Sequence, residues 1–107
     1  MRPVQRDEGP WQGTVAAWYG DTPHGCYDRG GTFTPHDGSV VFTAHKTLPC
    51  GTLIEVRYGA RRIVVAVRDR GPYGDARRDL DLSRAAFQAL APLSVGILKV
   101  EWRVVPA

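Results

Sequence analysis

The sequence predicts a mainly β domain in which about six short strands close into a barrel beside one short helix. The first observation is turn content, because 12 Gly and 8 Pro in 107 residues divide the chain into short elements. The second is that several apolar runs alternate with polar residues, as strands with one buried face do. The third is size, since so few strands in an open sheet would leave exposed edges that closure into a barrel removes.

An alternating run at residues 11–19 predicts the first strand, because its odd and even positions divide into two faces. Gly20 ends this strand. Residues 21–39 are rich in Gly, Pro, Asp, His and Thr, which predicts a long irregular excursion with a short extended piece at 32–34. Long loops in small domains are often functional. A short β-prone run at 40–44 follows.

A hairpin is predicted where two alternating runs, 53–58 and 61–68, are joined by a tight turn at Gly59 and Ala60. Apolar residues alternate with charged ones, so one face of each strand is expected to point inward. The expected inward residues are Ile54, Val56, Tyr58, Ile63, Val65 and Val67. A loop at 69–78 comes next.

One helix is predicted after this loop. Asp81 or Ser83 can accept first-turn amide protons, so we expect them to be helix caps rather than catalysts. The helix runs to about Ala91, and Pro92 stops it. Residues 95–105 then predict the closing strand. Its expected inward residues are Leu98, Val100, Trp102 and Val104.

The chain is predicted to be one domain, with a polar N-terminal extension at residues 1–10 and the barrel at 11–107. Its formal net charge is +3, but acidic residues lie among the arginines and no long basic run occurs, so nucleic acid is not the expected partner. No stretch approaches the roughly 20 apolar residues of a membrane helix, and the opening lacks a hydrophobic signal region. We expect a monomer without a membrane span.

The two cysteines, Cys26 and Cys50, are expected to form one disulfide, with two buried free thiols as the alternative. The bridge would close a loop of about 25 residues, which the chain-entropy model values at roughly 3 kcal/mol. Neither cysteine lies in a Cys-x-x-Cys spacing, and Cys26 has no familiar ligand spacing with His24 and His36. No metal and no cofactor are therefore expected.

Four segments of the chain occur in the order of four motifs of a known family. They are Ala17-Trp18-Tyr19-Gly20, Thr43-Ala44-His45-Lys46-Thr47-Leu48-Pro49-Cys50-Gly51-Thr52, Val67-Arg68-Asp69-Arg70-Gly71-Pro72-Tyr73 and Asp81-Leu82-Ser83-Arg84-Ala85-Ala86. With this ordered set the chain resembles the rare lipoprotein A (RlpA) family, whose members are double-psi β-barrels related to the barrel domain of expansins. The resemblance implies a six-stranded double-psi β-barrel and covers nearly the whole chain.

What the resemblance implies about function is cell-wall glycan chemistry. Members of the family include lytic transglycosylases that cleave peptidoglycan, while expansin-like relatives loosen polysaccharides without hydrolysis. By resemblance, Asp69 is the candidate catalytic acid and His45 its helper. The chain departs from the family pattern at 32–38, where active members often carry a Glu and this sequence has none. Asp37 is the candidate substitute, with a shorter side chain and a shifted spacing.

A lytic transglycosylase can work with one carboxyl group, because the muramic acid C6 hydroxyl attacks its own anomeric carbon and leaves a 1,6-anhydro sugar. Asp69 would act first as acid and then as base. The alternative is that Asp69 only caps a turn or pairs with an arginine such as Arg70, which could instead bind substrate carboxylates. His45 could equally be a structural histidine.

Three aromatic residues, Trp18, Tyr19 and Tyr73, are candidates for stacking against sugar rings, although aromatics at strand ends are equally often part of a core.

Three functions remain open from the sequence. The first is peptidoglycan lytic transglycosylase activity. The second is a non-catalytic, expansin-like module that binds or loosens polysaccharide. The third is a structural barrel in a virion or envelope assembly. The first two predict an extracytoplasmic location (secreted, periplasmic or in the cell wall), and the third a virion-associated one.

Overall fold

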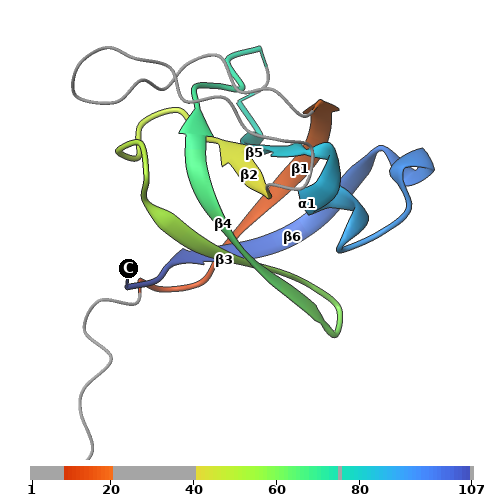
Figure 1. Cartoon of the computed structure of the whole chain (residues 1–107). Coiled ribbons are helices and arrows are strands. Elements are labelled where there is room, and N and C mark those ends of the chain that lie inside the picture. Colours follow the sequence, from red (N-terminus) through yellow and green to blue (C-terminus); the bar gives the residue numbers. More distant parts are fainter. Residues whose placement is uncertain (1–8, 21–40, 75, 107) are drawn as a thin grey trace, which may run out of the picture.

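Six strands, one α-helix and one 3₁₀ helix form the regular structure of the described residues, which are 9–20, 41–74 and 76–106 of this computed structural model. In chain order the elements are β1 (Gln12–Gly20), β2 (Phe42–Ala44), β3 (Leu53–Tyr58), β4 (Arg61–Asp69), β5 (Arg78–Ser83), α1 (Arg84–Gln88), η1 (Leu93–Val95) and β6 (Ile97–Val104). Figure 1 shows the strands wrapped around one another, with α1 beside β1 and β5. None of the helices in these ranges has the length and apolar character needed to cross a membrane.

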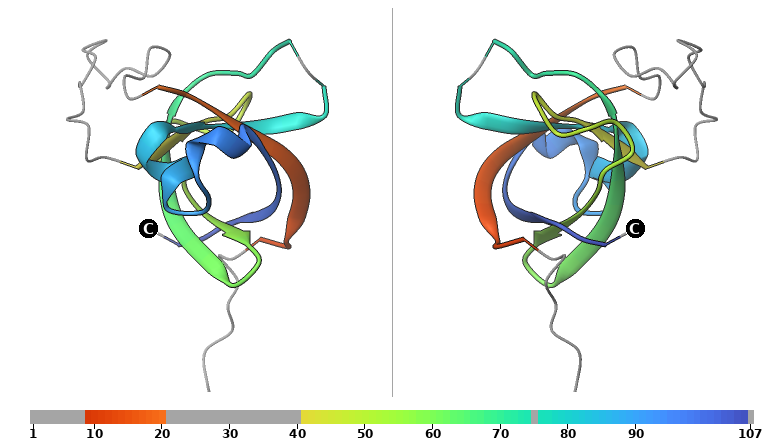
Figure 2. Two further views of the ribbon diagram at one scale, coloured as in Figure 1. Left: turned by 90° about the vertical axis from the view of Figure 1, so that its right-hand side faces the viewer. Right: turned by 90° about the vertical axis from the view of Figure 1, so that its left-hand side faces the viewer.

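The strands close into a barrel in the order β1-β5-β2-β4-β3-β6, and β6 pairs with β1 to complete it. Two neighbouring pairs are parallel, β1 with β5 and β2 with β4, and the other pairs are antiparallel. The closed ring is visible from two opposite sides in Figure 2. The prediction of a mainly β, six-stranded barrel with one short helix is therefore confirmed.

The hairpin of β3 and β4 has the predicted register, with Tyr58 opposite Arg61. Gly59 forms its turn with a φ of +58°, a conformation that favours glycine. The expected inward faces are largely confirmed, because the side chains of Ile54, Val56, Val65 and Val67 are buried. Tyr58 is an exception, since it is 37% exposed at the end of the strand next to the turn.

The region 78–83 corrects the prediction, because it is strand β5 rather than the end of a loop and the start of a helix. Leu80 and Leu82 alternate with Asp79 and Asp81, and the two leucines are fully buried. The prediction gave more weight to the preference of Asp and Ser for helix N-caps than to this alternation, which is typical of a strand.

The helix is shorter than predicted, ending at Gln88 rather than near Ala91. Ser83 is its N-cap, and the Ser83 hydroxyl accepts a hydrogen bond from the Ala86 amide. The prediction was correct for Ser83 and wrong for Asp81, which lies within β5.

The closing strand β6 pairs with both β1 and β3, and its residues Leu98, Val100 and Trp102 are buried as expected. It begins at Ile97, two residues later than predicted, because η1 occupies 93–95. The Gly9 amide donates a 2.9 Å hydrogen bond to the Val104 carbonyl, so the two ends of the barrel lie side by side. The extended piece expected at 32–34 lies outside the described residues.

Candidate functional site

Asp69 is the last residue of β4, and its side chain is nearly buried, at 6% exposure. One carboxylate oxygen, Oδ2, accepts a 2.6 Å hydrogen bond from the Tyr19 hydroxyl. The other, Oδ1, accepts a 2.8 Å bond from the backbone amide of Arg70. Both partners fix the orientation of the carboxylate, and neither is an arginine side chain.

Tyr19, near the end of β1, is held as a hydrogen-bond donor by its surroundings. Its ring lies edge-on to Phe42, with the ring centroids 6.2 Å apart. Burial raises the pKa of the Tyr19 hydroxyl, and the hydrogen bond to Asp69 and the charges of Asp69 and Asp81 raise it further. The Tyr19 hydroxyl therefore stays protonated at neutral pH and donates a hydrogen bond to Asp69.

A single row of paired residues crosses four strands and brings a second carboxylate to the site. Ala17 of β1 pairs with Asp81 of β5, Asp81 pairs with Ala44 of β2, and Ala44 pairs with Asp69 of β4. The register of β2 with β4 shifts between Thr43 and Ala44, and the charge of Asp69 still reaches Asp81, whose pKa it raises. With strands about 4.8 Å apart, the Cα atoms of Asp69 and Asp81 lie about 10 Å apart, with only the small Ala44 between them.

Asp81 belongs to the same electrostatic environment as Asp69. Burial raises the pKa of Asp81, Arg78 opposes this increase, and the charge of Asp69 adds to it. An Arg78 Nη1 atom lies 3.5 Å from Asp81 Oδ1, but this buried oxygen accepts no hydrogen bond in the described part of the chain. Asp81 is thus a further candidate for the site, which the sequence predicted to be a helix cap, although the alternation of residues 79–82 was a signal that it lies in a strand.

His45 follows β2 directly, and its ring is oriented by its own loop. The Nδ1 atom accepts hydrogen bonds of 3.1 and 3.0 Å from the Thr47 and Leu48 amides, which places the proton of the neutral ring on Nε2. The ring packs edge-on against Trp102, with centroids 5.2 Å apart. Burial lowers the pKa of His45, with further lowering by neighbouring cations against an opposing effect of Asp79, so the neutral form is favoured.

The contact between His45 and Asp69 is through the backbone, where the His45 amide donates a 3.1 Å bond to the Asp69 carbonyl. Among the described residues, no side-chain hydrogen bond joins them. His45 thus fixes the loop beside Asp69 through its backbone amide and its Nδ1 atom.

Arg70 turns its side chain away from Asp69 and towards the loop at 45–50. Its Nη1 atom donates to the His45 carbonyl at 3.1 Å and to the Leu48 carbonyl. Its Nη2 atom lies 3.2 Å from Cys50 Sγ. These contacts give Arg70 a role in holding the loop, and its predicted role in substrate binding stays a prediction.

The other two aromatic candidates, Trp18 and Tyr73, lie in different surroundings. Trp18 packs against the hydrophobic core, and its Nε1 atom donates a 3.1 Å hydrogen bond to the Leu93 carbonyl. It neighbours Tyr19 in the strand and so points to the opposite face. Tyr73 is 74% exposed in the loop after Asp69, where a ring is free to stack against a sugar.

The remaining candidates lie outside the described residues. They are His24, Cys26, His36 and Asp37. The predicted pairing of Cys26 with Cys50 therefore stays a prediction. In the ranges that the structure covers, no group of three or more His, Cys, Asp and Glu side chains is arranged to hold a metal ion.

The chain is similar in sequence to a known family and in fold to solved β-barrels. A family model described as "Lytic transglycolase" matches residues 12–102. The "Probable endolytic peptidoglycan transglycosylase RlpA" of Aquifex aeolicus is 40% identical over 92 residues, which cover 83% of this chain and 39% of that relative. The chain thus spans well under half the length of this curated relative.

Two solved structures have the same fold. A Streptomyces papain inhibitor is similar with a TM-score of 0.70 and 35% identity, covering 92% of this chain and 96% of that one. The expansin of Clavibacter michiganensis has a TM-score of 0.72 and 22% identity, covering 92% of this chain and 52% of that one. These similarities bear out the double-psi form of the barrel.

Proposed function

Because the chain belongs to the lytic transglycolase family of RlpA-like double-psi β-barrels, we propose that it acts on bacterial cell-wall glycans and cleaves peptidoglycan strands. The observation that carries this proposal is the Asp69 carboxylate, which Tyr19 and the Arg70 amide orient. A carboxyl group oriented by two hydrogen bonds can act as general acid and base when a substrate oxygen comes within hydrogen-bond reach of it.

In the proposed reaction, the neutral Asp69 carboxyl donates its proton to the glycosidic oxygen that joins muramic acid to the next sugar, and the bond from that oxygen to the anomeric carbon breaks. The Asp69 carboxylate then accepts the proton of the muramic acid C6 hydroxyl, whose oxygen bonds to the anomeric carbon. The products are a 1,6-anhydro end and a free hydroxyl end, and Asp69 is protonated again. No water is consumed.

Asp81 supports this cycle as a second acidic group. Burial raises the pKa of the Asp81 carboxyl, and the charge of Asp69 raises it further, so Asp81 retains a proton more readily than an isolated surface carboxyl group. The Asp69 carboxylate, once it has given up its proton, stabilises the positive charge that develops at the anomeric carbon.

The test is digestion of purified peptidoglycan, followed by mass spectrometry of the soluble products. We expect anhydromuramyl ends from the wild type and none from Asp69→Asn. Glu101→Gln is the matched control, because it makes the same acid-to-amide change at an exposed position of β6. Absence of anhydro ends with the wild type would refute the cleavage activity.

A second candidate function is inhibition of a papain-like protease. The specific observation in its favour is the solved papain inhibitor, nearly all of which is matched by this chain at 35% identity. Papain hydrolysis of a fluorogenic peptide, measured with increasing amounts of this protein, tests it. A rate that does not change at protein concentrations well above that of papain rules this function out.

A non-catalytic wall-binding module, comparable to an expansin barrel, is the outcome if the protein sediments with peptidoglycan sacculi but releases no products. Both wall functions place the protein outside the cytoplasm, which we propose as its location. The virion role has no support from the relatives described above.

A further inference from the structure

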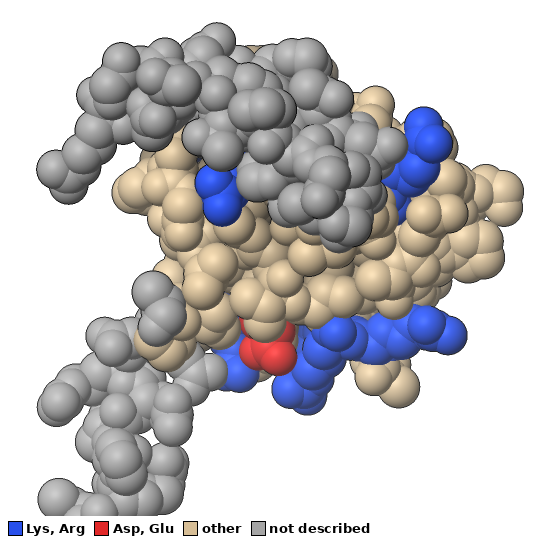
Figure 3. Space-filling model, viewed as in Figure 1, with Lys and Arg blue, Asp and Glu red and all other residues tan. Residues whose placement is uncertain are grey.

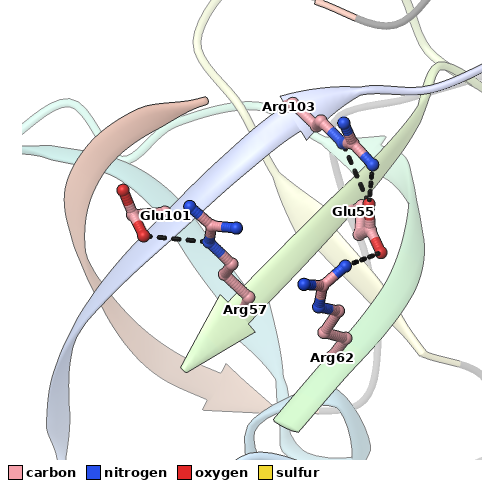
Figure 4. Close-up of polar contacts among 5 residues, drawn as sticks. All are labelled: Glu55, Arg57, Arg62, Glu101 and Arg103. Atoms are coloured by element: carbon pink, nitrogen blue, oxygen red, sulfur yellow. Dashed lines mark hydrogen bonds and ion pairs between the residues drawn. The ribbon is translucent and has the colours of Figure 1, made fainter. Parts of the chain in front are cut away.

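A cluster of charged side chains covers the outside of the barrel where β3, β4 and β6 lie together. Figure 3 shows Lys and Arg atoms gathered along the lower edge of the molecule, with acidic atoms between them. Figure 4 shows five members of the cluster and their contacts. They are Glu55, Arg57, Arg62, Glu101 and Arg103.

Arg57 is held rigidly in this cluster. Its Nε atom donates a 2.9 Å hydrogen bond to Glu101, and its guanidinium lies 3.8 Å above the centre of the Trp11 ring. A planar guanidinium that is stacked on an aromatic ring and bonded through Nε presents both terminal nitrogens in a fixed direction. In the described part of the chain, no hydrogen bond uses these terminal nitrogens.

The Glu55 carboxylate contacts both Arg103 and Arg62, and its contact with Arg103 is the closer one. Arg103 donates to Glu55 from Nε and Nη2, at 3.0 and 2.8 Å. Arg62 is 3.8 Å from the other oxygen of Glu55, and its side chain is 56% exposed. Glu55 is thus bonded mainly to Arg103, which leaves the Arg62 guanidinium available to a ligand.

These side chains border a pocket of about 420 Å³. It is lined by Arg57, Tyr58, Gly59, Arg62, Lys99, Val100 and Glu101. Three cations thus face one carboxylate, which is already bonded to Arg57. The Lys99 ammonium, in the described ranges, has no ion-pair partner. The pocket therefore has an excess of positive charge and of unused hydrogen-bond donors.

The pocket lies far from Asp69. Arg62 and Asp69 occupy opposite ends of β4. At about 3.3 Å per residue, the seven steps between them span about 23 Å. The pocket is therefore a separate site, and what it binds does not depend on whether the barrel cleaves peptidoglycan.

We propose that this pocket binds the phosphate group of a sugar or polyol phosphate, for which poly(glycerol phosphate) is the probe. A planar guanidinium can donate two parallel hydrogen bonds to two oxygens of one phosphate group. Donors that come from three strands surround a tetrahedral anion better than a planar carboxylate. The volume also has room for the sugar or polyol next to the phosphate. A single confined cluster does not provide the extended basic track that nucleic acid needs.

The test is calorimetric titration of the intact protein with poly(glycerol phosphate) in about 0.15 M salt, where long-range charge effects are screened. The pocket variant is Arg62→Gln with Lys99→Gln. The control is Arg61→Gln with Arg77→Gln, which removes the same charge. Arg61 is adjacent to Arg62 but lines a different pocket, so the comparison separates position from net charge.

We expect the pocket variant to raise the Kd at least about tenfold and the control to change it less than about twofold. Thermal unfolding of both variants checks that the barrel is intact, and Lys99→Gln alone serves if the double variant unfolds.

Equal weakening by both variants would overturn the proposal in favour of general charge attraction. Tighter binding of single-stranded DNA would overturn it in favour of nucleic acid, and equal binding of polygalacturonate would overturn the preference for phosphate. Failure of the wild type to bind poly(glycerol phosphate) refutes it directly.

Discussion

The Tyr19 hydroxyl and Asp69 Oδ2 are 2.6 Å apart, although β5 and β2 separate their strands in the order of the barrel. The hydrogen bond spans the row of paired residues that contains Asp81 and Ala44. The curvature of the closed sheet brings together side chains that a flat sheet would hold apart.

Tyr19→Phe is expected to lower the rate of anhydromuramyl product formation by roughly 10- to 150-fold, because a hydrogen bond to a charged group contributes about 1.5–3 kcal/mol. The ring and its contact with Phe42 remain, but the buried Asp69 carboxylate loses a donor, so the melting temperature should also fall by several degrees. Product release measured by mass spectrometry over time tests the rate. An unchanged rate would show that the hydroxyl does not orient Asp69 during catalysis.

Asp81→Asn is expected to reduce product formation while making the fold more stable at pH 7. The folded state raises the pKa of Asp81 above its ordinary value of 3.8, so it binds more protons than the unfolded state and loses stability as pH rises through the folded pKa. An amide avoids this loss. Urea unfolding at pH 7 and pH 3.5 measures it, and the stability gain of the variant should shrink at the lower pH. A gain of equal size at both values would contradict the raised pKa.

His45 gives the opposite pH dependence. Its pKa is lowered in the fold from 6.5, so its contribution to stability is present above that value and is lost as pH falls through the folded pKa. Protonation also removes the acceptor for the Thr47 and Leu48 amides. Wild type should lose more stability than His45→Ala between pH 7.5 and 4.5, measured by urea unfolding. The difference between the two proteins isolates His45 from the other histidines, and parallel curves would exclude it as the titrating group.

Ser83→Ala is expected to destabilise the barrel by about 1–3 kcal/mol, because a buried hydroxyl that serves two backbone amides is lost. Ser83 Oγ accepts a 3.1 Å bond from Phe42 of β2 as well as the 3.3 Å cap bond from Ala86. Thermal unfolding measures the effect. Ser94→Ala, at an exposed position of η1, is the control and should leave the melting temperature nearly unchanged.

The sequence predicted the elements whose apolar residues alternate cleanly. The bounds of the hairpin at 53–69 and of the closing strand were predicted to within one or two residues. In each strand, apolar residues such as Ile54, Val65 and Leu98 belong to a series that occupies every second position. Strand β5 was missed since Asp79 and Asp81 are poor strand formers by intrinsic preference. Pairing on both sides overrides that preference.

The candidate site was predicted in part. Asp69 and His45 were named from motif resemblance, and Tyr19 as an aromatic that could stack against a sugar ring. The structure instead gives the Tyr19 hydroxyl a direct hydrogen bond to Asp69, and it joins His45 to Asp69 only through the backbone. The approach of Asp81 could not be predicted, because it depends on β2 lying between β4 and β5. Such an order is set by contacts between distant parts of the chain, which local patterns do not encode.

The hydrogen bond from Gly9 to Val104 has a consequence for how this barrel can be combined with other domains. Entry and exit points that touch allow a domain to be placed inside a surface loop of a host protein without forcing the host's two halves apart. The same proximity permits circular permutation, with a short linker joining the strand ends near Gly9 and Val104 and new termini opened at the β3–β4 turn. The barrel is therefore a transferable unit for engineering.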